Sequence, residues 1–136
     1  MSNITQVVNE NKNMTTLKKG VVASGLDKVL SGTGPYTVFA PSDLAFTKLD
    51  KGKFETLLKP ENKAKLEDTI NYHIVSGKLD YKDLKDGEKL KTVNGQELSV
   101  QVKEGRVSIQ GAKIENRDLQ TSNGVIHVLD TVMIKN

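Results

Sequence analysis

The sequence predicts one α+β domain over residues 1–136, in which short helices pack on a largely antiparallel sheet. Apolar residues recur at helical spacing in the first half and alternate with polar residues after about residue 72. Turn signals containing glycine separate the alternating segments, as expected of successive hairpins. A length of 136 residues is typical of one domain.

The first half predicts three short helices, whose apolar stripes begin at Ile4, Met14 and Leu26. Ser2 and Asn3 are candidate caps for the first of them. Residues 36–40 are rich in β-branched and aromatic side chains and are followed by a proline, which indicates a strand.

Two further helical segments follow this strand. Ser42 caps a helix that carries Phe46, and Pro60 precedes a longer helix on which Leu66 and Ile70 share a face. A shorter helical turn is expected between them, at residues 54–58.

The second half predicts hairpins. Residues 98–103 and 106–110 alternate apolar with polar side chains, as half-buried strands do. The pairs Asn94-Gly95, Glu104-Gly105 and Asn123-Gly124 lie between the alternating segments, and Asn-Gly is favoured in two-residue hairpin turns.

The composition excludes several function classes. Twenty basic residues nearly balance seventeen acidic ones, and Arg106 and Arg117 are the only arginines, so nucleic acid is not expected as a partner. Without cysteine the chain has no thiol nucleophile, disulfide or cysteine zinc site. No apolar run is long enough to span a membrane. Residues 1–20 contain no basic-then-apolar leader, so an export signal is expected to be absent from this sequence.

Three segments together resemble the fasciclin domain family: residues 37–46 (TVFAPSDLAF), 72–77 (YHIVSG) and 123–130 (NGVIHVLD). The likeness extends over most of the chain, which is similar to a single-module, bacterial-type member. The resemblance implies a compact wedge of short helices packed on a β-sandwich-like core. It also implies a role in cell adhesion, in a secreted, periplasmic or cell-surface protein, with no cofactor and no catalytic residue.

The resemblance also implies a binding region, because in animal members the Tyr-His segment and nearby apolar residues are linked to integrin binding. We expect Tyr81 to be the exposed anchor of such a surface. The candidate partner-binding residues are Tyr72, His73, Ile74, Leu79, Tyr81 and Leu84.

Ser42, Asp43 and His73 are expected to be structural polar residues. Ser42 can cap the following helix and Asp43 suits its positive end. We hypothesise that a partly buried His73 hydrogen-bonds to the turn at Ser42 and Asp43. Its pKa falls if burial dominates and rises if the Asp43 charge dominates. A Ser-His-Asp triad is disfavoured, because the histidine would have to contact both other residues.

Three function classes follow. The first is an extracellular or cell-envelope adhesion module, which binds another protein or a glycan by surface complementarity. The second is a small-ligand-binding domain or an enzyme, which requires an apolar pocket with convergent polar groups. The third is a structural domain with weak homophilic self-association.

Overall fold

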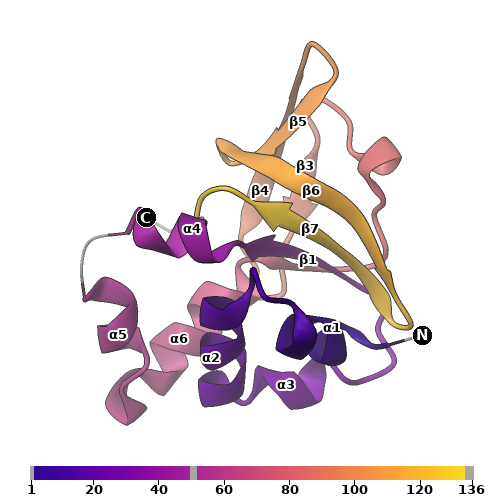
Figure 1. The fold of residues 1–136 in the computed structure, drawn as a ribbon. Helices are drawn as coiled ribbons and strands as arrows, with labels where there is room; N and C mark the ends of the chain where they lie inside the picture. The colour runs from indigo at the N-terminus through magenta and orange to yellow at the C-terminus, as the bar shows by residue number, and fades with distance from the viewer. Residues whose placement is uncertain (1, 50–51, 134–136) are drawn as a thin grey trace.

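The computed structural model describes residues 2–49 and 52–133 (Figure 1). The first half carries the helices α1 (Ile4–Glu10), α2 (Thr15–Ser24), α3 (Leu26–Val29), α4 (Asp43–Thr47), α5 (Lys53–Leu57) and α6 (Lys63–Asn71), with the strand β1 (Tyr36–Pro41) and the 3-10 turn η1 (Pro60–Asn62) among them. The second half carries the strands β2 (Ile74–Ser76), β3 (Lys89–Lys91), β4 (Glu97–Lys103), β5 (Arg106–Ile109), β6 (Ala112–Thr121) and β7 (Gly124–Leu129), with the 3-10 turn η2 (Tyr81–Asp83).

Side-chain caps begin two of the helices where the sequence predicts them. The side chain of Asn3 accepts a hydrogen bond from the backbone N–H of Gln6, and the Gln6 side chain accepts one from Asn3, both at 2.8 Å. The Ser42 hydroxyl accepts a hydrogen bond from the N–H of Ala45 at 3.2 Å, which caps α4. Each bond satisfies a backbone donor that the first turn of a helix leaves without a partner.

The strands form one mixed sheet in the order β2-β1-β7-β6-β5-β4-β3. β1 pairs with β7 in parallel, and the other neighbouring strands pair in antiparallel fashion. A bridge between Val75 and Thr92 brings β2 at one end of the sheet to β3 at the other, so the sheet nearly closes on itself.

The α+β class is therefore confirmed, but the expected β-sandwich-like core is wrong. A sandwich has two facing sheets, whereas these strands curl into one barrel-like sheet. Register shifts in β6 between Ile114 and Asn116 and between Asn116 and Leu119 mark where this long strand bends. Such bulges increase the twist and curvature of a strand, which allows the sheet to turn back toward its own far end.

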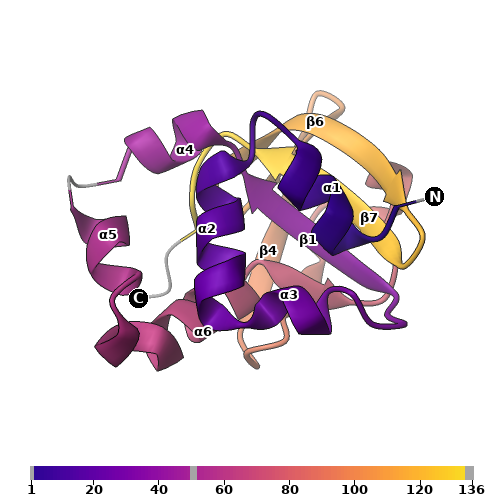
Figure 2. The same cartoon turned by 60° about the horizontal axis from the view of Figure 1, so that its bottom comes forward.

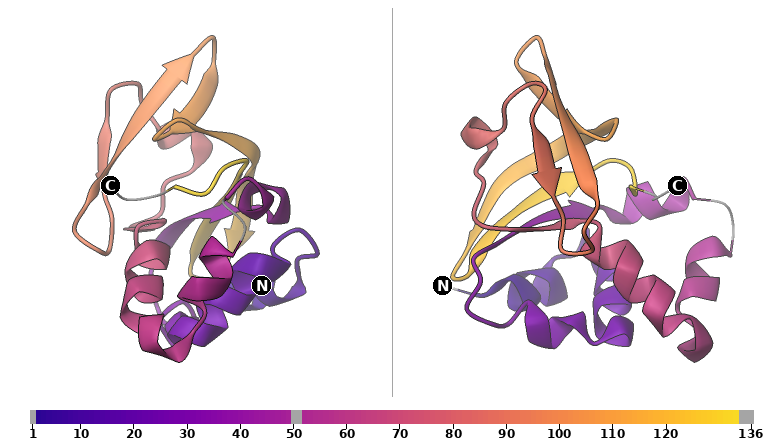
Figure 3. Two further views of the ribbon diagram at one scale, coloured as in Figure 1. Left: turned by 90° about the vertical axis from the view of Figure 1, so that its left-hand side faces the viewer. Right: turned by 180° about the vertical axis from the view of Figure 1, so that it is seen from behind.

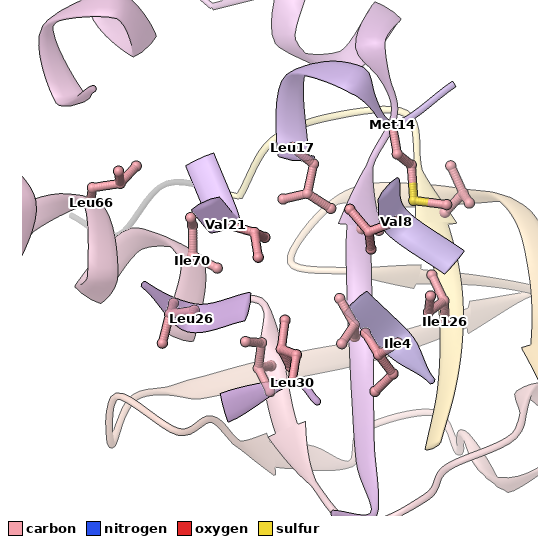
Figure 4. Close-up of a cluster of buried hydrophobic side chains, with 14 residues drawn as sticks. Ile4, Val8, Met14, Leu17, Val21, Leu26, Leu30, Leu66, Ile70 and Ile126 are labelled. Atoms are coloured by element: carbon pink, nitrogen blue, oxygen red, sulfur yellow. The ribbon is translucent and has the colours of Figure 1, made fainter. Parts of the chain in front are cut away.

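Two apolar cores lie on the two sides of β1 and β7. The first joins the helices to one face of these strands through Val38 and Val128, and Figure 4 shows its helical side chains. Figure 2 shows α1 in front of β1 and β7, with α2 and α3 beside it. The second core fills the interior of the curled sheet and contains Phe39 and Leu129. Alternate residues of one strand thus serve different cores, and all six residues of β7 are buried.

The turn between β6 and β7 is tied to the helices. The side-chain oxygen of the buried Asn123 accepts a hydrogen bond from the N–H of Ile4 at 2.9 Å. Its amide donates to the carbonyl oxygens of Leu30 and Gly32 at 2.7 and 2.8 Å. A residue predicted only as part of a turn therefore joins three distant segments.

Candidate functional site

Four of the six candidate partner-binding residues lie in the core. Tyr72, His73, Ile74 and Leu84 expose between 1 and 5% of their surface. A partner that docks on the folded domain cannot contact these side chains, because neighbouring residues cover them. The Tyr-His segment is instead a junction where α6 ends and β2 begins.

His73 does not bond to the turn at Ser42 and Asp43, so that hypothesis is wrong. Its Nδ1 lies 2.9 Å from the carbonyl oxygen of Thr69, and its Nε2 accepts a hydrogen bond from the N–H of Met133 at 3.0 Å. Since a backbone N–H can only donate, Nε2 carries no proton and Nδ1 donates to Thr69. The ring therefore joins α6 to the segment that follows β7.

Burial decides the charge state of His73. Burial lowers the pKa of His73 to about 4, although the hydrogen bond to Thr69 acts in the opposite direction. Of the two possibilities that the sequence leaves open, the structure therefore selects the neutral imidazole. Protonation of Nε2 would place its hydrogen against the N–H of Met133.

Ser42 and Asp43 hold the start of α4 against α2. The Asp43 carboxylate accepts hydrogen bonds from the hydroxyl of Thr15 at 2.7 Å and from the N–H of Thr16 at 2.8 Å. Burial opposes the charge of this carboxylate, but these hydrogen bonds outweigh it and lower the pKa of Asp43. Both Ser42 and Asp43 are thus occupied by structural contacts, and His73 bonds to neither, so the three do not form a triad.

His127 is a second buried imidazole with two backbone partners. Its Nδ1 accepts a hydrogen bond from the N–H of Asp118 at 3.2 Å, and its Nε2 donates to the carbonyl oxygen of Leu79 at 2.7 Å. The ring stacks on Phe39 with 5.7 Å between the centroids. Burial lowers the pKa of His127, against the opposing hydrogen bond to Leu79 and the charge of Asp118.

Tyr81 is half-exposed and is held in place by several contacts. Its N–H donates to the Asp118 carboxylate at 2.9 Å, and its hydroxyl accepts from the N–H of Val107 at 3.0 Å. The guanidinium carbon of Arg117 lies 4.2 Å from the ring centroid, within the range of a cation–π contact. Leu79, two residues earlier, is likewise half-exposed. Its N–H donates to the hydroxyl of Thr37 at 2.8 Å.

Two surface hollows meet at Tyr81. The larger, of about 580 Å³, lies against β5 and the start of β6. It is lined by Tyr81, Gln101, Lys103, Glu104, Arg106, Val107, Ser108, Lys113 and Ile114. The smaller, of about 460 Å³, lies beside Asp80, Lys82, Arg117, Asp118 and Gln120. Figure 3 (right) shows the turn that carries Tyr81 beside the strands on this side of the molecule.

A third hollow, of about 490 Å³, lies among α4, α5 and α6. Its walls include the rings of Phe46 and Phe54, whose centroids are 4.7 Å apart, together with Leu49, Leu57 and Val132. Lys53 and Lys65 also line it. The lining of this hollow is mostly apolar, as is typical of pockets that bind small ligands.

The described residues contain no group of three or more histidine, aspartate or glutamate side chains arranged to hold a metal ion. Within the same ranges, none of the helices has both the length and the apolar character needed to cross a membrane.

Comparison with known proteins identifies the family. The sequence model of the Fasciclin domain matches residues 12–135. The chain belongs to the fasciclin domain family. The resemblance of the three sequence segments is thereby confirmed, and the fasciclin fold accounts for the way short helices pack on a curled sheet.

Bacterial and animal proteins share this fasciclin domain. Protein sll1483 of Synechocystis is 41% identical over 131 residues, which are 96% of this chain and 72% of that protein. The transforming growth factor-beta-induced protein ig-h3 of Sus scrofa is 35% identical over 135 residues, which are 98% of this chain and 19% of that protein. The chain therefore spans about a fifth of the animal relative.

A solved structure gives the same fold. The domain pair of the insect cell adhesion molecule fasciclin I matches with a TM-score of 0.88 over 98% of this chain and 51% of that chain. The sequence identity is 18%, so this likeness concerns the fold alone.

Sequence reasoning missed the residues that surround Tyr81 in this fasciclin domain. In the sequence, Arg106 and Arg117 argue only against nucleic-acid binding, yet in the structure both lie beside Tyr81. Asp118, which has a positive φ of 56°, accepts the hydrogen bond of the Tyr81 N–H. The chain offers no local signal for the grouping, since these residues come from η2, β5 and β6.

Proposed function

We propose that this fasciclin domain is an adhesion or protein-interaction module of the extracellular space or the cell envelope. It binds another protein or a glycan through the surface around Tyr81, by shape and charge and without catalysis. The observation that carries the proposal is a half-exposed tyrosine fixed between two surface hollows by Asp118, Val107 and Arg117.

The physical basis is preorganisation. An aromatic anchor that is already held in its bound position loses little conformational freedom on binding, so more of its contact energy appears as affinity. Tyrosine and arginine are the residue types that most often dominate protein interfaces. Leu79 lies on the same segment and is the other half-exposed member of the predicted set. The description of fasciclin I as a cell adhesion molecule agrees with this role.

An attachment assay tests the proposal. The purified domain is applied to surfaces coated with extracellular matrix or with bacterial cells, and the bound amount is compared among variants. Tyr81→Ala is expected to reduce attachment, whereas Leu44→Ala, which truncates a side chain that is 66% exposed on α4, is expected to leave it unchanged. Equal attachment by both variants would show that Tyr81 does not contribute to binding.

Stability must be separated from binding in this assay. The Tyr81 hydroxyl accepts a hydrogen bond from the Val107 N–H, so Tyr81→Ala lowers the free energy of unfolding as well. Tyr81→Phe loses the same hydrogen bond and keeps the ring. Attachment measured well below the melting temperature should therefore fall with Tyr81→Ala and persist with Tyr81→Phe.

Binding of a small apolar ligand is the second candidate, favoured by the hollow among α4, α5 and α6. An apolar fluorescent dye that raises the melting temperature of the wild type, and fails to do so for Phe54→Ala, would support it. Homophilic self-association is the third, and a molar mass that is independent of concentration in light scattering would exclude it.

A further inference from the structure

The larger hollow beside Tyr81 exists because two neighbouring strands diverge. β5 and β6 pair only at Ser108 with Lys113 and at Ile109 with Ala112. Within the described residues, Arg106 and Val107 of β5 have no partner on β6, and the hydroxyl of Tyr81 accepts the hydrogen bond of the Val107 N–H instead. The tyrosine therefore closes one end of a groove whose walls are the two diverging strands.

The walls of this groove are predominantly basic. Lys103, Arg106 and Lys113 line it, and Glu104 is the one acidic residue among its described lining residues. All four side chains are exposed. The three cations outnumber this single carboxylate, so the lining carries a net positive charge. Their charge is therefore available to a ligand.

The groove also offers hydrogen-bonding and apolar surface. Gln101 and Ser108 place an amide and a hydroxyl in the lining, and Ile114 and the ring of Tyr81 supply apolar contact. Arg117 covers part of the Tyr81 ring and adds a cation at the boundary with the smaller hollow.

We propose that this groove binds an acidic polysaccharide, with carboxylate or sulfate groups paired to Lys103, Arg106 and Lys113 and a sugar ring packed against Tyr81. The inference rests on the proposed function and names the partner class for the same surface. A charged glycan carries anionic groups, hydroxyl groups and apolar C–H faces on every repeat, which matches the three kinds of lining. An acidic peptide repeats its carboxylates, but it does not carry hydroxyl groups and apolar C–H faces on every residue.

Direct binding of defined oligosaccharides tests the inference. The probes are a galacturonate oligosaccharide, its methyl ester, a sulfated dextran oligosaccharide and an oligoglutamate peptide, each titrated into the full chain by calorimetry. The ester keeps the sugar backbone and loses the charge. We expect the galacturonate or the sulfated probe to bind and to weaken as salt rises, with no binding of the ester.

Matched charge variants locate the site. The groove variant carries Lys103→Gln, Arg106→Gln and Lys113→Gln. The control variant carries Lys12→Gln, Lys28→Gln and Lys59→Gln, three exposed lysines away from the groove, so that both lose the same net charge. The dissociation constant should rise about tenfold or more in the groove variant and change less than about twofold in the control.

Three outcomes overturn the inference, and a fourth separates it from the proposed function. Equal weakening in the two variants would show a general charge effect, and tighter binding of oligoglutamate at the same residues would indicate an acidic protein partner. If Tyr81→Ala abolishes attachment to a surface but no acidic oligosaccharide binds, the proposed function stands and the glycan inference fails. If the domain binds the acidic probe but attaches to no surface, the glycan inference stands and the proposed adhesive role fails.

Discussion

The buried His73 makes the stability of the fold dependent on pH. Its folded pKa of about 4 lies below the value of about 6.5 for an unfolded chain, so the unfolded chain takes up the proton first as pH falls. The contribution of the neutral imidazole is complete above about pH 6.5 and is lost progressively as pH falls toward about 4. The substitution His73→Gln isolates this contribution, because glutamine keeps a polar side chain that does not titrate.

The size of the effect follows from the pKa difference. At about 1.4 kcal/mol per pKa unit, the wild type loses about 3 kcal/mol through His73 between about pH 7 and about pH 4. That is a large part of the free energy of unfolding of a domain, which is about 5–15 kcal/mol.

Urea unfolding followed by circular dichroism at several pH values measures it. His73→Gln is expected to be less stable than the wild type near neutral pH, because the contacts to Thr69 and Met133 change. The difference should shrink by about 3 kcal/mol as pH falls to about 4. Other groups, including His127, titrate in both proteins and cancel in the comparison. A difference that stays constant across this range would refute the reasoning.

Two further substitutions test how the turn between β6 and β7 and the start of β7 join β1 and the helices. A Cβ atom on Gly124 would lie 1.9 Å from the carbonyl oxygen of Tyr36, so Gly124→Ala should lower the free energy of unfolding by more than about 4 kcal/mol or prevent folding; a small loss in urea titration would contradict the parallel pairing at this point. Asn123→Ala leaves the N–H of Ile4 and the carbonyl oxygens of Leu30 and Gly32 without their partner, and should cost about 3 kcal/mol, with faster amide exchange at Ile4 as the specific sign.

The parts of the fold that could be predicted from the sequence are those that local interactions decide. Asn3 and Ser42 cap helices through backbone donors only three residues away, and the strand alternation around Val100 and Val107 follows from burial of one face. The antiparallel hairpins follow from the turns between consecutive strands.

The closure of the sheet could not be predicted, because it depends on distant segments. β1 pairs in parallel with β7, although more than 80 residues separate Pro41 from Gly124. The end of β3 meets β2 through the bridge between Val75 and Thr92. One of the two partners of the His73 ring is similarly remote, since the N–H of Met133 is 60 residues away. Contacts between such distant residues produce no periodic pattern in the sequence.

The buried His127, which lies outside the Tyr-His segment, supports the candidate site through the residues that hold Tyr81. One imidazole, that of His127, donates to the carbonyl of Leu79 and accepts from the N–H of Asp118, and the Asp118 carboxylate accepts from the N–H of Tyr81. Both segments that position the tyrosine are thus fixed to a neutral ring buried against Phe39. Apolar residues of the predicted partner-binding set, such as Leu84, belong to the core that supports Tyr81. Truncating them would therefore displace Tyr81 and lower the stability of the fold, and both effects would weaken binding. A binding loss without a stability loss is expected only from side chains in the groove itself, which is why the exposed cations beside Tyr81 are the sharper test of how this domain recognises a partner.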